Sequence, residues 1–239
     1  MPNKSYTPNN PNLKQTSLQV VQKILSKNDK KAQEMRESYA RDNLYVINLM
    51  SSPGSGKTTL LEQLAINNAF QFAVIEGDLQ TNRDAERLEK RGVRAHQILT
   101  GEACHLEAVM IEQAYQALKS TGALDVEYLF IENVGNLVCP ASYDLGAHLN
   151  IVLLSTPEGD DKVLKYPTMF LCADAVVISK ADLCAIFDFS IERVREDLDT
   201  LKSNIPIFLT NAKDAKSLKD LVKFIKDSKK AGYYSRHCF

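Results

Sequence analysis

SSPGSGKTT, residues 51–59, lies directly behind the apolar run 44–50 and directly ahead of the apolar pattern at 60–64. The order strand, glycine-rich loop and helix is what a phosphate-binding P-loop requires, because the loop amides and the positive end of the helix face the phosphates. Lys57 is expected to reach the β- and γ-phosphate oxygens, and the Thr58 hydroxyl to ligate Mg²⁺. Ser51 departs from the motif G-x-x-x-x-G-K-[ST], which begins with glycine. Nucleotide binding is therefore predicted for Ser52, Pro53, Gly54, Ser55, Gly56, Lys57, Thr58 and Thr59.

The composition is that of an ordinary globular protein. Of the 239 residues, 44% are hydrophobic and 25% are charged, and the net charge of −1 provides no overall field that favours nucleic acid or a membrane. No apolar stretch approaches the length of a membrane span, and residues 1–12 lack the apolar core of a signal peptide. Five widely spaced cysteines are more typical of a reducing compartment than of a disulfide framework. We therefore expect a cytoplasmic location.

The N-terminal part differs from the rest of the chain. Residues 1–12 are rich in proline and asparagine, which predicts disorder. Two short helices are expected next, the first at Leu18–Leu25 and the second capped by Asp29 and running to Tyr39. Residues 1–43 would thus form a disordered tail and helical extension, ahead of one P-loop nucleotide-binding domain at 44–239.

From residue 44 onward, apolar runs alternate with helical patterns. This alternation predicts an α/β fold, with a mostly parallel P-loop NTPase sheet flanked by helices and ligands bound at the carboxyl ends of the strands. The expected strands lie at 44–50, 71–76, 93–98, 126–131, 149–155, 174–179 and 206–209. The expected helices lie at 57–67, 82–91, 103–119, 191–203 and 217–229.

Two acids follow the predicted strands at 71–76 and 126–131. Asp78 and Glu132 would converge on the phosphate pocket, where carboxylates suit a Mg²⁺ ion or orient the attacking water. Magnesium is therefore assigned to Thr58, Asp78 and Glu132, and catalysis to Lys57, Asp78 and Glu132. The backbone amide of Gly135 is expected to reach the γ-phosphate, so that this segment responds to hydrolysis.

The choice of base should be encoded after the sixth predicted strand. SKAD, residues 179–182, resembles the guanine-reading motif N-K-x-D, with Ser179 in place of asparagine. The Asp182 carboxylate can accept both adjacent N–H groups of guanine, and the stem of Lys180 would cover the purine face. Asn211 and Ala212 would close over the base with backbone donors. These residues favour GTP and GDP.

A second cluster offers soft metal ligands. Cys104 and His105 are adjacent at the start of a predicted helix, where neighbouring side chains diverge by about 100°, so a third ligand is needed. Cys139 is the obvious candidate. Thiolates with an imidazole suit Zn²⁺, and Ni²⁺ where planar geometry is available. By spacing alone, buried cysteines without a metal remain the simpler interpretation.

Taken together, the motifs resemble the HypB family, the GTPases that assist nickel insertion into nickel–iron hydrogenase. The resemblance covers the chain from Leu44 to its end. It rests on SPGSGKT at 52–58, EGD at 76–78, TGEACHL at 100–106, ENVGNLVCP at 132–140, and EGDDK at 158–162 with KYP at 165–167. The stretch at 132–140 is the most specific.

This resemblance implies a SIMIBI-class P-loop fold, slow GTP hydrolysis and a homodimer promoted by GTP. It also implies nickel or zinc at Cys104, His105 and Cys139, with the nickel carrier HypA and the hydrogenase large-subunit precursor as partners. Some family members carry an N-terminal Cys-x-x-Cys site or a histidine-rich stretch. Residues 1–43 contain neither cysteine nor histidine, so any metal is expected on the GTPase domain.

Three other functions share parts of this sequence pattern. A urease-type nickel-maturation GTPase would place a Cys-Pro-His motif in this region, whereas Ala141 follows Cys139 and Pro140. A P-loop kinase should show an arginine-rich lid. A non-catalytic metal-binding scaffold with a vestigial P-loop is suggested by the Ser51 and Ser179 departures. An assay of GTP turnover with a Lys57→Ala control separates the last alternative from the GTPase.

Overall fold

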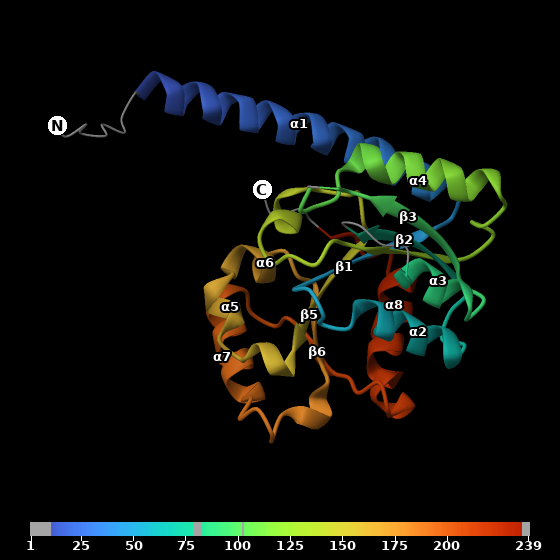
Figure 1. Cartoon of the computed structure of the whole chain (residues 1–239), viewed down its shortest axis with the longest axis vertical. Helices are drawn as coiled ribbons and strands as arrows, with labels where there is room; N and C mark the ends of the chain where they lie inside the picture. Colours follow the sequence, from blue (N-terminus) through green and yellow to red (C-terminus); the bar gives the residue numbers. More distant parts are fainter. Residues whose placement is uncertain (1–10, 79–82, 102, 236–239) are drawn as a thin grey trace, which may run out of the picture.

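A single parallel sheet organises the chain in the computed structural model, which describes residues 11–78, 83–101 and 103–235, with side chains from residue 22 onward. Its strands are β1 (Tyr45–Ser51), β2 (Phe72–Asp78), β3 (Arg94–Leu99), β4 (Tyr128–Glu132), β5 (Leu149–Ser155), β6 (Ala175–Ser179) and β7 (Ile207–Leu209). The seven strands lie in the order β3-β2-β4-β1-β5-β6-β7, and every neighbouring pair is parallel (Figure 1). The predicted sheet is confirmed.

The helices cover both faces of this sheet (Figure 1). The described α-helices are α1 (Pro11–Arg41), α2 (Lys57–Ile66), α3 (Arg83–Glu89), α4 (Ala108–Ser120), α5 (Lys162–Lys165), α6 (Pro167–Leu171), α7 (Ile191–Leu201) and α8 (Lys219–Lys230). Short 3₁₀ turns lie at η1 (Cys139–Ser142), η2 (Thr156–Glu158), η3 (Ala181–Leu183) and η4 (Ala215–Leu218). The sequence pattern did not predict α5 and α6, because each is too short to show a helical period.

Alternation along the strands builds a separate core on each face of the sheet. In β1, Ile47 and Leu49 pack with α2, α3 and α8, whereas Val46 packs with α1 and α4 on the opposite face. A third cluster joins β5 and β6 to α6 and α7. Cys172 of that cluster is disulfide-bonded, although the cysteine spacing favoured a reducing compartment.

The N-terminal extension differs from its prediction. A single helix of 31 residues, α1, replaces the two short helices and already begins at Pro11. No glycine, and no proline after Pro11, interrupts this stretch, so nothing in it stops a helix once the helix packs. Asp29, predicted as a cap, lies inside the helix. Residues 1–10 are outside the described part of the chain.

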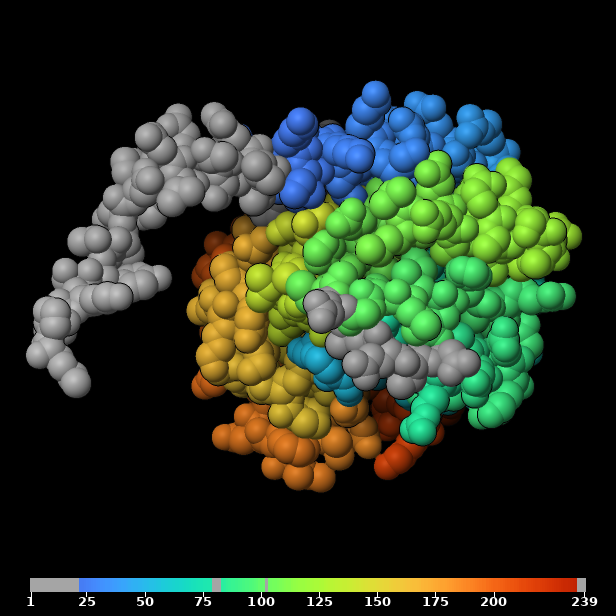
Figure 2. Space-filling view, turned by 45° about the horizontal axis from the view of Figure 1, so that its top comes forward, coloured from blue at the N-terminus to red at the C-terminus, as the bar shows by residue number. Residues whose placement is uncertain are grey.

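The C-terminal part of α1 lies along α4 on the outer side of one sheet face, and the two helices run side by side in the space-filling view (Figure 2). Buried Met35 and Tyr39 join α1 to this core. Among the described residues, no helix is both long enough and apolar enough to cross a bilayer. The boundary between extension and domain at residues 43 and 44 stays a prediction.

The strand order determines where a ligand can bind. β1 lies at the centre, with β4 on one side and β5 on the other, so the chain connections depart in opposite directions from this point. Open α/β sheets form their binding crevice at such a switch point, beyond the carboxyl ends of the strands. The stretch 51–59 leaves β1 there, and Glu132 ends the adjacent strand β4.

Candidate functional site

The loop between β1 and α2 has the backbone of a phosphate cradle. Gly54 and Gly56 adopt φ values of 72° and 95°, which other residues rarely reach, and α2 begins at Lys57. Lys57 is only 8% exposed, and its ammonium donates to the Ser51 hydroxyl at 3.0 Å. Burial lowers the pKa of Lys57. A buried cation among loop amides and a helix N-terminus favours a polyphosphate anion.

Glu132 lies at the place expected for magnesium. Its Oε1 accepts from the Thr58 hydroxyl at 2.7 Å, which joins the two predicted magnesium residues. Its other oxygen is buried and has no hydrogen-bond partner. Burial raises the pKa of Glu132 to about 7. A buried carboxylate with an unused oxygen beside a hydroxyl suits a hard cation such as Mg²⁺.

A second buried carboxylate, which the sequence did not predict, lies beside Glu132. Glu76, only 2% exposed, pairs in register with Glu132, and its Oε2 is also buried without a partner. Burial, and next the charge of Glu132, raises the pKa of Glu76 to about 8. Ligand atoms of Glu76, Asp84 and Glu132 lie within 4.8 Å of one another. Asp78, assigned to magnesium and catalysis from the sequence, lies two residues further along and is not a member of this group.

Glu76 and Asp84 were thus missed by sequence reasoning. A signal for Glu76 was available, because a charged residue inside a buried strand needs a partner. Asp84 is the second residue of α3, and its Oδ1 accepts from Arg87 at 2.8 Å, while Arg87 also pairs with Glu62 at 2.5 Å. No comparable pattern marked Asp84 in the sequence.

Gly135 packs directly on the phosphate loop. A side-chain carbon added at Gly135 would lie 2.7 Å from the Cα and 2.9 Å from the nitrogen of Pro53. Only glycine therefore permits this close approach. The predicted proximity of Gly135 to the loop is present in the structure, whereas its bond to a γ-phosphate stays a prediction.

A pocket of about 240 Å³ opens beside the loop at the predicted base site. Its walls include the predicted residues Lys180, Asp182, Asn211 and Ala212, together with Ser55, Gly56 and Thr59 of the loop. The structure therefore brings three separate segments of the sequence into one cavity. Its size and its carboxylate suit a purine base that offers N–H donors.

Two side chains tie this pocket to the phosphate loop. The Ser179 hydroxyl donates to the Ser55 carbonyl at 2.6 Å, and the Lys180 ammonium donates to the Gly54 carbonyl at 2.9 Å. Glu158, the first residue of the EGDDK motif, accepts hydrogen bonds from the hydroxyls of Ser52 and Ser55. The loop is thus held from both β5 and β6.

The three predicted soft ligands do meet. One donor atom from each of Cys104, His105 and Cys139 lies within 4.8 Å of the others. The Cys104 thiol donates to the Cys139 sulfur at 2.8 Å, and Cys104 Sγ lies 3.7 Å from His105 Nδ1. Burial lowers the pKa of His105, which favours the neutral imidazole that metals bind.

The predicted divergence of Cys104 and His105 is wrong. The helix expected at 103–119 begins only at Ala108, so both residues lie in the loop ahead of it. Loop backbone has no fixed 100° step, and both side chains turn towards Cys139. Tyr143, which sequence reasoning missed, stacks on the His105 ring at 3.8 Å with an interplanar angle of 20°. An aromatic four residues after Cys139 gave no recognisable signal.

A P-loop at the switch point of a parallel sheet, with buried carboxylates where magnesium is predicted, defines a nucleotide-binding P-loop protein. Residues 45–209 match the family described as CobW/HypB/UreG, nucleotide-binding domain. The Cys104, His105 and Cys139 cluster lies within that span. The chain belongs to the HypB family of maturation factors, a nucleotide-binding GTPase family.

Several relatives support this assignment. The hydrogenase/urease maturation factor HypB of Helicobacter pylori strain J99 is 63% identical over 232 residues, which cover 97% of this chain and 96% of the relative. The crystal structure of Helicobacter pylori HypB in complex with nickel superposes with a TM-score of 0.87 at 64% identity, covering 89% and 100% of the two chains. Archaeoglobus fulgidus HypB superposes with a TM-score of 0.75 at 33% identity, covering 85% and 99%.

Proposed function

We propose that this protein hydrolyses GTP to GDP and phosphate with low intrinsic turnover and uses its nucleotide state to bind and release Ni²⁺ for the nickel–iron hydrogenase precursor. The nickel is cargo, held by Cys104, His105 and Cys139, and Zn²⁺ suits the same donors. Proposed partners are a second copy of the chain, the nickel carrier HypA and the hydrogenase large-subunit precursor. A cytoplasmic location completes the proposal.

One observation carries this function. The segment from Glu132 to Cys139 contacts both sites: Gly135 lies against Pro53 of the phosphate loop, and Cys139 lies 2.8 Å from Cys104. A change around the γ-phosphate that moves Gly135 therefore also moves a metal ligand. Because binding linkage is reciprocal, metal must equally alter nucleotide affinity.

The residues present fit the proposed magnesium ion. The Thr58 hydroxyl and the free oxygen of Glu132 would hold it, and Glu76 supplies further negative charge. Magnesium would neutralise charge on the β- and γ-phosphates. Lys57 would bind phosphate oxygens, Asp182 and Lys180 would recognise guanine, and Asp78 remains a candidate for orienting water.

Nickel affinity in the GDP and GTP-analogue states, read by the thiolate charge-transfer band, tests the proposal. We expect the two states to differ in the wild type, and Cys139→Ala both to weaken binding severely and to abolish the difference. Lys57→Ala should remove nucleotide binding and turnover while leaving nickel affinity unchanged. Identical nickel affinity in both nucleotide states would refute the coupling.

Urease is a second candidate recipient. The Helicobacter pylori relative bears the name hydrogenase/urease maturation factor and matches nearly the whole chain. We propose that nickel from this chain is suited to both recipients. The test adds the purified protein to cell extracts that lack it and measures hydrogenase and urease activity separately. Activation of both enzymes supports the proposal, and activation of hydrogenase alone contradicts it.

A further inference from the structure

The metal cluster depends on two segments that are distant in the sequence. Cys104 and His105 lie just ahead of α4, whereas Cys139 begins η1 after β4. The sulfur atoms of Cys104 and Cys139 lie 2.8 Å apart, so the distance between the two segments must be fixed. If the two segments moved freely relative to each other, the donor atoms would separate and any metal site that they form would weaken.

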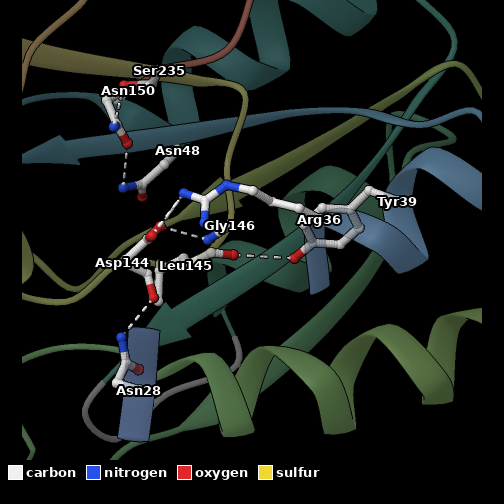
Figure 3. Close-up of polar contacts among 9 residues, drawn as sticks. All are labelled: Asn28, Arg36, Tyr39, Asn48, Asp144, Leu145, Gly146, Asn150 and Ser235. Atoms are coloured by element: carbon white, nitrogen blue, oxygen red, sulfur yellow. Dashed lines mark hydrogen bonds and ion pairs between the residues drawn. The ribbon is translucent and has the colours of Figure 1, made fainter. Parts of the chain in front are cut away.

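We propose that Asn28 of α1 is a positioning residue that joins these two segments and thereby sets the distance between Cys139 and the pair Cys104 and His105. The Asn28 side chain is buried, with 7% exposed. Its Oδ1 accepts from the backbone nitrogen of Ala108 at 2.9 Å. Its Nδ2 donates to the carbonyl of Asp144 at 2.8 Å (Figure 3). Both hydrogen-bonding ends of one amide are thus used, one on each segment.

The contacts made by Asn28 lie close to the ligands along the chain. Ala108 is the third residue after His105 and the first residue of α4. Asp144 directly follows Tyr143, the residue that stacks on the His105 ring. A displacement of Asp144 therefore moves both the stacking partner of His105 and the turn that carries Cys139.

The helix α1 fastens this second segment at further points. The Arg36 guanidinium donates to both oxygens of the Asp144 carboxylate, at 2.9 and 2.7 Å, and the Gly146 amide donates to Oδ1 at 2.8 Å. The Tyr39 hydroxyl donates to the Leu145 carbonyl at 3.3 Å (Figure 3). Hydrogen bonds between charged groups are stronger than neutral ones, so the contact of Arg36 with Asp144 fixes the position of the residue that carries the carbonyl bound by Asn28.

This arrangement gives α1 a role at the metal site although none of its described residues belongs to the proposed ligands. Residues that orient metal ligands typically change metal affinity by about 10–100-fold when replaced. The role of Asn28 rests on the proposed function only in that the cluster is the nickel site. The bridge between the segments is a property of the protein without metal, and it is tested in that state.

The first experiment measures the effective concentration of the Cys104 and Cys139 thiols for each other in metal-free protein. Glutathione redox buffers set the equilibrium, and peptide mass spectrometry quantifies this one disulfide. Asn28→Leu keeps a similar volume but makes neither hydrogen bond, and should lower the effective concentration about tenfold. Asn28→Asp keeps the acceptor for Ala108 but loses the donor to Asp144, and should lower it to a smaller extent.

Asp42→Ala is the matched control. Asp42 directly follows α1 and accepts from Lys119 of α4 at 2.6 Å and from the Tyr115 hydroxyl. Its loss therefore loosens the contact of α1 with the later turns of α4, away from the hydrogen bonds of Asn28 with Ala108 and Asp144. We expect wild-type effective concentration in this variant. The proposal is overturned if Asn28→Leu and Asn28→Asp both match the wild type, or if Asp42→Ala changes the value as much as they do.

A nickel titration of the same proteins separates this inference from the proposed function. We expect Asn28→Leu to bind Ni²⁺ about tenfold more weakly, with an altered charge-transfer band, and Asp42→Ala to match the wild type. A wild type that takes up no nickel refutes the proposed cargo, while the thiol measurement still decides the role of Asn28. Unchanged nickel affinity and an unchanged band in Asn28→Leu overturn its role at the metal site.

Discussion

Ser51 and Ser179 stand where related motifs carry glycine and asparagine, and the structure uses both hydroxyls. The Ser51 hydroxyl accepts from the buried Lys57 ammonium at 3.0 Å and so gives this charged group a hydrogen-bond partner. Ser179 donates to the carbonyl of Ser55 and so joins the base pocket to the phosphate loop. Each departure introduces a hydrogen bond inside the site. We therefore expect a working P-loop rather than a vestigial one.

At Asp182, we predict that GTP binds at least tenfold more tightly than ATP, a difference of about 1.4 kcal/mol. The carboxylate can accept two N–H groups of guanine, whereas adenine presents an acceptor in that direction. Asp182→Ala should remove the preference in a competition assay against a fluorescent nucleotide. Lys216→Ala is the control, because Lys216 is exposed and does not line the pocket. Equal affinities of the wild type for GTP and ATP would exclude the guanine assignment.

At Glu76, we predict a stability that depends on pH in protein free of nucleotide and metal. Folding raises the pKa of this acid from 4.5 to about 8, so the folded state favours the protonated form. The contribution of Glu76 to the free energy of unfolding is therefore greatest below pH 4.5, and it is lost as the pH rises from 4.5 through 8. Glu76→Gln should therefore stabilise the protein at pH 9, by about 2 kcal/mol, and much less at pH 5.

Urea unfolding of the two proteins at both pH values, with chelator present, measures this difference. Glu89→Gln removes the same charge from an exposed position of α3 and should show no such pH dependence. A Glu76→Gln variant whose stability parallels that of the wild type from pH 5 to 9 would contradict the prediction.

At the scale of elements, α1 and the loop after η1 depend on a close contact at Gly146. Its φ is 74°, and a side-chain carbon there would lie 2.6 Å from the Ala32 carbonyl oxygen. Gly146→Ala should therefore destabilise the protein by about 2–4 kcal/mol, since steric overlap adds to backbone strain. Gly92 has a similar φ of 78° but open space around it, so Gly92→Ala isolates the strain alone. Denaturant unfolding that finds equal losses for both variants would refute the packing argument.

The charged loop from Glu158 to Pro167 follows the carboxyl end of β5, and several of its side chains bind other parts of the chain. Asp160 is buried and accepts from the Ser190 amide and the Arg193 guanidinium, both at 3.0 Å. Glu158 contacts the phosphate loop. Asp161 and Lys162 remain candidates for a contact between subunits.

At the scale of the whole molecule, we predict that a GTP analogue shifts the protein from monomer to a two-fold dimer. One chain supplies three soft donors, whereas Zn²⁺ usually takes four ligands, so a partner can complete the coordination. Val138, directly before Cys139, is 58% exposed, so its apolar side chain is available for contact with a second subunit beside the cluster. Light scattering with GDP and with the analogue measures the shift.

A charged variant at the same position tests the geometry of that dimer. Val138→Lys should weaken analogue-induced association without changing GTP affinity, because Val138 lies beside the metal cluster and outside the base pocket. The same mass with GDP and with the analogue in the wild type would contradict the dimer prediction.

The sequence by itself determined the sheet, the phosphate loop, the segment proposed to bind the base, and the three soft donors of the proposed metal site. These features are local, since strand and helix patterns, glycine positions and motif spacing are properties of short stretches. Tertiary packing alone decided that α1 is one helix, because Asn28 and Asp29 are weak helix formers and Asn28 finds its partners in Ala108 and Asp144. It also decided that Glu76 rather than Asp78 faces Glu132, and that Cys104 and His105 converge on Cys139. Such relations arise between residues far apart in the chain, where no local pattern encodes which side chains will meet.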